Sequence, residues 1–289
     1  MAVAFALVAA VLFAFATVLQ QKAGMDEGAG GSASGLLLRM ARRPVWLGGV
    51  LADALGYLAQ AVALGVGRLA VVQPVLVSTV VFALPLGARF TGQRVRAVDV
   101  GAALLVTAGL VVFLIVADPS GGRDNAPAGE WLLAAGVIGI LTVPLALIAR
   151  ALAPAPRAAL LGTAAGMLFG LTAALTKAVV DRLDDGVLDL LVNWEVYALI
   201  VVGYVAMTFN QLALSTGALA PAVATGLAFN PITSVVLGTT LLQESLHEST
   251  IGVIATVLAL AAALVGMVIL ARSQSGPAAG TTAPAQARR

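Results

Sequence analysis

Long apolar stretches of about twenty residues alternate with short polar segments along the whole chain. A helix that crosses the roughly 30 Å hydrocarbon core of a bilayer needs about 20 apolar residues. Nine stretches meet this requirement, at residues 2–20, 45–64, 69–88, 97–116, 131–149, 158–179, 196–214, 218–242 and 251–271. The pattern predicts an all-α polytopic membrane protein, because a helix satisfies its own backbone hydrogen bonds in lipid.

Composition and charge agree with this interpretation. Hydrophobic residues make up 60% of the chain and charged residues 10%, whereas about 25% of a soluble domain is charged. Only Asp53, Asp99 and Lys177 place a charge inside a predicted span, and all three tryptophans lie at span ends, as in an interfacial aromatic belt. The net charge of +2 and the absence of a basic stripe exclude a nucleic-acid partner. The absence of cysteine excludes disulfides and thiolate metal sites.

The lysines and arginines fall mostly on one side of the predicted topology. Because cytoplasmic loops carry the excess of basic residues, the N-terminus is predicted outside and the C-terminus in the cytoplasm, within a bacterial inner membrane. The tail at 273–289 is rich in glycine, alanine, proline and threonine and is predicted to be disordered.

The second half of the sequence repeats polar positions of the first half. Residues Thr17, Lys22, Ala23 and Asp26 recur as Thr172, Lys177, Ala178 and Asp181, and Gln60, Gly87 and Gly101 recur as Gln211, Gly238 and Gly252. A step of five spans reverses the orientation, so the pattern predicts two inverted four-helix repeats, at 1–117 and 158–272, with a linking loop and helix at 118–157. Chance similarity among apolar helices is the alternative.

Short motifs resemble a known superfamily. Asn230-Pro231, Gly238, the segment Leu242-Gln243-Glu244-Ser245-Leu246 and Ile251-Gly252 resemble the closing signature of EamA-type members of the drug/metabolite transporter superfamily. The first half, with Trp46, Gln60, Gln73-Pro74 and Gly101, is more similar to the NIPA-type magnesium transporter branch, which also has nine spans. The sequence departs from the pattern at Gln93, where the first-half counterpart of the signature glutamate is expected.

This resemblance implies a secondary active transporter that moves a small metabolite or drug-like organic molecule by alternating access, or alternatively Mg²⁺. A non-transporting membrane scaffold or lipid-flipping partner is the alternative from another class. No phosphate-binding glycine loop or catalytic triad occurs in the sequence, so neither an enzyme nor a bound cofactor is expected. The expected partners are the substrate and the lipid bilayer, with the protein a monomer or a homodimer.

Asp53 is the sharpest candidate for a transport residue, because a carboxylate deep in hydrocarbon is costly and marks an ion or solute pathway. Asp53, Tyr57 and Gln60 share one helix face, and the second repeat supplies Tyr204, Thr208 and Gln211 at similar spacing. We expect these two polar stripes to face each other across a midplane cavity, with coupling to H⁺ through Asp53. Interhelical hydrogen bonding is the alternative.

The remaining candidates concern gating and helix geometry. Lys22 and Lys177, with Thr17 and Thr172, are predicted gate or substrate-anion contacts, unless the lysines only reach the headgroups. Pro74, Pro221 and Pro231 are predicted to kink or break their helices, with Asn230 as a ligand contact. Glu244 is expected to be solvated in an outer loop, and with Asp53 it would be the Mg²⁺ ligand. The glycine stripe Gly162, Gly166 and Gly170 predicts close internal packing.

Overall fold

The computed structural model describes residues 1–27, 43–92, 95–183, 186, 191–216, 218–246 and 250–274. Within these residues, nine helical spans are long and apolar enough to cross a membrane, in the order and close to the positions that the sequence predicts. The prediction of an all-α polytopic membrane protein is therefore confirmed. The tail predicted to be disordered lies outside the described residues beyond 274.

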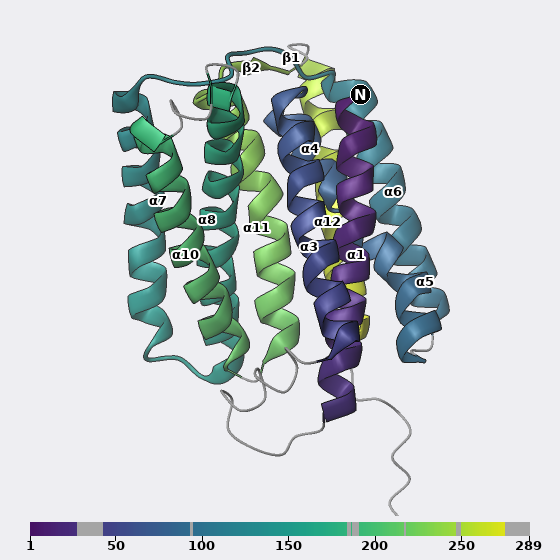
Figure 1. Ribbon diagram of the computed structural model, residues 1–289. Helices are drawn as coiled ribbons and strands as arrows, with labels where there is room; N and C mark the ends of the chain where they lie inside the picture. The colour runs from purple at the N-terminus through teal and green to yellow at the C-terminus, as the bar shows by residue number, and fades with distance from the viewer. Residues whose placement is uncertain are drawn as a thin grey trace, which may run out of the picture.

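The spans are formed by long helices that run alternately down and up the bundle (Figure 1). The helices are α1 (Ala2–Glu27), α3 (Pro44–Gly65), α4 (Leu69–Leu76), α5 (Thr79–Thr91), α6 (Ala97–Ala117), α7 (Ala128–Ala149), α8 (Pro154–Arg182), α10 (Trp194–Leu214), α11 (Leu219–Thr240) and α12 (Thr250–Gln274). Two short strands, β1 (Ser120–Gly121) and β2 (Glu244–Ser245), pair antiparallel at the end of the bundle where the N-terminus lies. We call this the strand end.

Local sequence explains where several helices begin. Pro44 and Pro154 start α3 and α8, where the missing N–H of proline costs nothing. The Asp99 carboxylate accepts a hydrogen bond of 2.7 Å from the Arg96 backbone N–H, as part of a capping box at the start of α6. Asp99, one of the three charges inside the predicted spans, is thereby explained as a helix cap.

The helix of the third span is interrupted. α4 ends at Leu76 and α5 begins at Thr79. Between them, the N–H groups of Val77 and Ser78 donate to carbonyls three residues earlier, those of Pro74 and Val75, instead of four residues earlier. A break or kink near Pro74 was predicted, and the interruption follows Pro74, which lies inside α4, by three residues. Neither Pro221 nor Pro231 breaks its helix, because α11 is continuous through both. Pro221 lies in the first turn of α11, where its missing N–H has no partner to lose.

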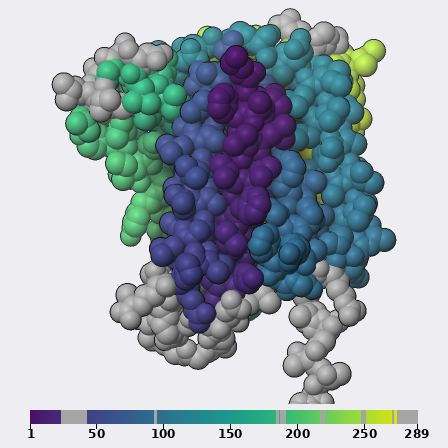
Figure 2. Space-filling model, turned by 45° about the vertical axis from the view of Figure 1, so that its right-hand side comes forward, coloured from purple at the N-terminus to yellow at the C-terminus, as the bar shows by residue number. Residues whose placement is uncertain are grey.

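Two helix clusters make up the bundle. In the first, α1 packs against α3, α4 and α5, and in the second, α8 packs against α10, α11 and α7. Figure 2 shows α3 and α1 side by side on the surface, with α5 against the lower part of α1. The last spans of the two halves, α6 and α12, pack against each other, as do α4 and α11.

Glycines set the closest helix contacts. A Cβ at Gly162, Gly166 or Gly170 of α8 would collide with the backbone or side chains of α11, so this stripe allows the two helices to approach closely. The predicted internal packing of the stripe is confirmed. A similar contact joins α6 and α12, where a Cβ at Gly109 would lie 2.6 Å from the Ala259 carbonyl oxygen.

Candidate functional site

The polar stripe of α3 lies near the middle of the bundle's height. Asp53 is about 14 Å along α3 from its first residue, at 1.5 Å per residue, and its side chain is half-buried, as is that of Gln60. Tyr57 is 57% exposed and its ring packs edge-on against Phe13 of α1, with 5.0 Å between ring centroids. Among the described residues, none forms a hydrogen bond or ion pair with the Asp53 carboxylate.

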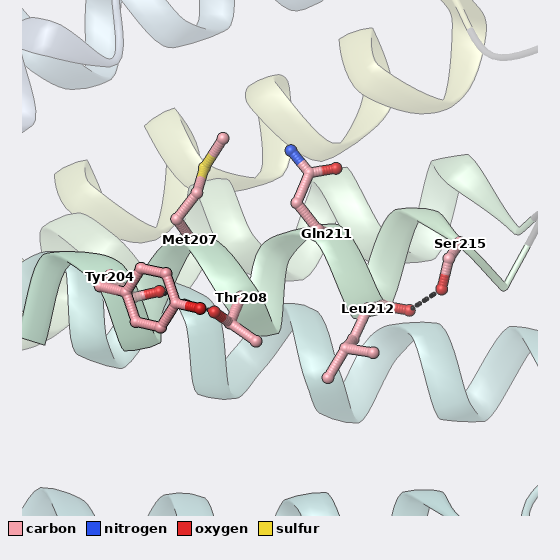
Figure 3. A pocket seen from close by; sticks show the side chains of 6 residues that line it. All are labelled: Tyr204, Met207, Thr208, Gln211, Leu212 and Ser215. Carbon is pink, nitrogen blue, oxygen red and sulfur yellow. Dashed lines mark hydrogen bonds between the residues drawn. The ribbon is translucent and has the colours of Figure 1, made fainter. Parts of the chain in front are cut away.

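The polar stripe of α10 lies on the outer surface of its helix. Tyr204 is 74% exposed, and Thr208 and Gln211 are exposed as well. Together with Met207, Leu212 and Ser215 they line a shallow hollow of about 430 Å³ (Figure 3). Five of the six lining residues belong to α10, and Ser215 is the residue that follows its last turn. The Thr208 hydroxyl donates to the Tyr204 carbonyl one turn earlier, at 2.8 Å.

The expected shared cavity between the two stripes is therefore not what the structure shows. α10 turns its small residues, such as Ala206 and Ala213, into the bundle, and α8 is the helix against which it packs most extensively. Because Tyr204 and Thr208 lie on the opposite face of α10, they point away from that contact. The small residues, which allow close packing, form the buried face of α10. The polar stripe on the opposite face is therefore exposed.

Asn230 lies at the contact of α11 with α8, since a Cβ at Gly170 would lie 3.0 Å from its carbonyl oxygen. That carbonyl accepts the Ser234 hydroxyl at 2.9 Å, and the Asn230 side chain is half-buried. Its predicted role as a ligand contact stays a prediction. Thr17 and Thr172 donate to the carbonyls of Phe13 and Leu168 in their own helices, both at 2.8 Å.

Lys177 is buried at the strand end rather than extended to the headgroups. Its side chain is 2% exposed, and its ammonium donates to the carbonyls of Leu64 at 3.1 Å and Gly67 at 3.0 Å and to the Asp124 carboxylate at 2.8 Å. These three acceptors match the three donors of an ammonium. The residue therefore ties α8 to the turn between α3 and α4.

Lys22, the counterpart of Lys177 in the predicted repeat, lies at the opposite end of the bundle. Its ammonium is 5.9 Å from the centroid of the Phe90 ring, a distance within the range of a cation–π interaction. The two lysines thus lie at opposite ends of the bundle, as the sequence predicts, but in different surroundings.

The expectation that Glu244 is solvated is wrong. Glu244 is 2% exposed, and its two carboxylate oxygens accept the backbone N–H groups of Leu69 at 2.6 Å and Ala70 at 2.8 Å. The pairing of β2 with β1 holds the residue over the N-terminus of α4. A carboxylate there is stabilised by the unpaired N–H groups and the helix dipole, and both oxygens are already used.

The segment between α6 and α7 adds polar contacts that the sequence did not identify. Arg123 donates to the Leu241 carbonyl at 2.8 Å and forms an ion pair with Glu130. Asn125 donates to the buried Glu195 carboxylate at 3.0 Å and accepts the Trp131 indole N–H at 3.0 Å. The charges of this segment were visible in the sequence, but nothing there indicated their distant partners.

A comparison with known proteins gives one relative. The uncharacterised protein Cgl0250/cg0304 of Corynebacterium glutamicum is 32% identical over 281 residues, which cover 96% of this chain and 97% of the relative. The chain belongs to the family of that protein. The similarity extends over nearly the full length of both family members, so the whole bundle is the shared unit. No family model matches the chain, and no solved structure matches it.

The protein described here also has an apolar groove of about 410 Å³ between α7, α8 and α11. Its walls are mainly leucine, isoleucine, valine and phenylalanine side chains, with Glu130 at the strand end. Among the described residues, no group of three histidine, aspartate or glutamate side chains could hold a metal ion.

Proposed function

We propose that this protein is a secondary active transporter of a small organic solute, with Asp53 on the pathway. Asp53 carries the proposal, since a half-buried carboxylate near the middle of a membrane span is costly unless water, a proton or a substrate meets it. The other two charges inside the predicted spans are accounted for by Asp99 capping α6 and Lys177 holding a turn.

Two arrangements support alternating access between two inverted repeats. The contacts within the two halves correspond, because α1 and α8 each pack on the following spans of their own half, and the fourth spans pack on each other. The buried charges Lys177 and Glu244 join the halves at the strand end, which is the outer side in the predicted topology. In this proposal the described conformation is closed to the outside, and Asp53 couples solute movement to a proton.

The Mg²⁺ alternative has less support. Magnesium prefers oxygen ligands, and of the two predicted ligands, Glu244 already uses both oxygens on backbone N–H groups. The EamA resemblance of the closing signature favours an organic solute. A membrane scaffold or lipid-flipping partner is the other alternative, and a flux assay separates it from a transporter.

The test is solute-driven proton flux in proteoliposomes that contain a trapped pH-sensitive dye. The panel contains amino acids, nucleosides, quaternary ammonium compounds and Mg²⁺. We expect an organic solute to drive flux above that of empty liposomes, and Asp53→Asn to reduce it at least about tenfold and to remove its pH dependence, because the carboxyl proton is lost. Asp118→Asn, on an exposed loop, is the matched control. An unchanged rate and pH dependence in Asp53→Asn would reject the role of Asp53, and flux driven by Mg²⁺ alone would favour the alternative.

A further inference from the structure

Two buried side chains of opposite charge hold the turn between α3 and α4, and both come from the other half of the chain. Lys177 donates to the carbonyls of Leu64 and Gly67, and Glu244 accepts the N–H groups of Leu69 and Ala70. The signs match the two helix dipoles, because the cation meets the C-terminal end of α3 and the anion meets the N-terminal end of α4. Side chains of the second half therefore bind the turn at the end of α3 and at the start of α4.

The first half has a second lysine in the corresponding place. Lys22 follows Thr17 by the same five residues that separate Lys177 from Thr172, and it lies near the end of α1 as Lys177 lies near the end of α8. Lys177, in the second half, donates to the Leu64 carbonyl at the end of α3 in the first half. Lys22, in the first half, lies over the Phe90 ring of the same half. The two equivalent lysines thus differ in which half they contact.

We propose that Lys177 and Lys22 are alternating latches. In the described conformation Lys177 closes the strand end by binding the carbonyls of Leu64, in the last turn of α3, and Gly67, in the turn that follows. In the opposite conformation Lys177 releases them, and Lys22 binds the C-terminal carbonyls of α10 at the opposite end. This inference rests on the proposed function, and it assigns regulation of access to two named side chains. Each latch shifts the equilibrium because its hydrogen bonds exist in only one conformation.

The chain lacks cysteine, so pairs of spin labels can report on each end separately. Val66→Cys with Leu183→Cys places two exposed positions at the strand end, and Leu47→Cys with Ser215→Cys does so at the opposite end. Distances are measured by pulsed electron paramagnetic resonance, with the protein in lipid nanodiscs and no solute.

We expect Lys177→Met to change the ratio of the two conformations by at least about tenfold, which corresponds to about 1.4 kcal/mol. Distances at the strand end should lengthen while those at the opposite end shorten. Lys22→Met should shift both pairs in the reverse direction. Arg182→Gln is the control, because Arg182 pairs with Glu195 inside the second half at 3.2 Å. It should leave both distances unchanged even where it lowers stability.

A merely structural role for Lys177 predicts broader distances at both ends without a reciprocal change, and that result would overturn the proposal. If Lys177→Met does not fold, Lys22→Met decides, and its failure to shift the ratio would also overturn the latch. Two conformations that neither lysine affects would reject the latch and leave the transporter intact. A single conformation in all variants, together with no solute flux, would reject both.

Discussion

Replacing Glu244 by glutamine removes one buried charge and one acceptor from the N-terminus of α4. The carboxylate now accepts the N–H groups of both Leu69 and Ala70, and a glutamine could accept only one of them while its amide N–H₂ faced the other donor. The side chain has little room to turn away, because a Cβ at Gly238 would lie 2.6 Å from Glu244 Oε2. Among the described residues, Glu244 is the acceptor for both N–H groups, so one buried N–H would lose its partner.

The expected cost follows from these contacts. A hydrogen bond to a charged group contributes about 1.5–3 kcal/mol, and a charge at a partly buried helix terminus contributes up to about 2 kcal/mol. Because glutamine keeps one of the two bonds, we expect Glu244→Gln to lower the free energy of unfolding by about 2–4 kcal/mol. Glu130→Gln is the matched control. The Glu130 side chain is 43% exposed in its ion pair with Arg123, and an exposed pair contributes less than about 1 kcal/mol.

Unfolding in dodecyl maltoside with increasing SDS, followed by tryptophan fluorescence, measures both variants against the wild type. Trp131 is buried beside Trp194, with 6.1 Å between ring centroids, so loss of this packing should change the emission. Equal free energies of unfolding for Glu244→Gln and Glu130→Gln would refute the capping argument. It would mean that water or another group satisfies the α4 terminus in solution.

Two further changes test packing and the polar segment. Gly166→Ala should lower the melting temperature strongly, because its Cβ would lie 2.5 Å from the Gly226 carbonyl oxygen. Gly136→Ala is the control and should leave the melting temperature unchanged, because a Cβ at Gly136 meets nothing within 4 Å. Equal melting temperatures for the two variants would contradict this prediction. Asn125→Ala should cost about 1–3 kcal/mol, since it removes partners of Glu195 and Trp131. An unchanged tryptophan spectrum and unfolding free energy would show that these bonds contribute little.

Hydropathy was sufficient to predict the nine spans, because lipid imposes length and apolar composition on every helix. The glycine stripe of α8 also indicated its own packing, since three small residues at helical spacing present a flat face to α11. The break in the third span lies near Pro74, between Leu76 and Thr79. Pro231 has the same chemistry without the same result, and the sequence contains no local signal that separates the two.

The prediction failed where a side chain's environment depends on a distant segment. Glu244 was expected to be solvated because it lies in a predicted outer loop, but its partners are Leu69 and Ala70, 175 and 174 residues away. The α10 stripe was expected to face a cavity because it matches the α3 stripe in spacing. Spacing shows that residues share a face, but the neighbouring helices decide whether that face is buried.

The partners of the charges inside the spans also indicate which of these charges have a structural role. Each such charge needs a partner that lowers its cost in lipid. Asp99 finds one within its own helix terminus, and Lys177 finds three acceptors at the strand end. Asp53 has none among the described residues, and in the proposed transporter its partner is a proton, water or a solute. A site that depends on an exchangeable partner is what a transporter needs near the middle of the membrane, and a permanently packed scaffold does not need one.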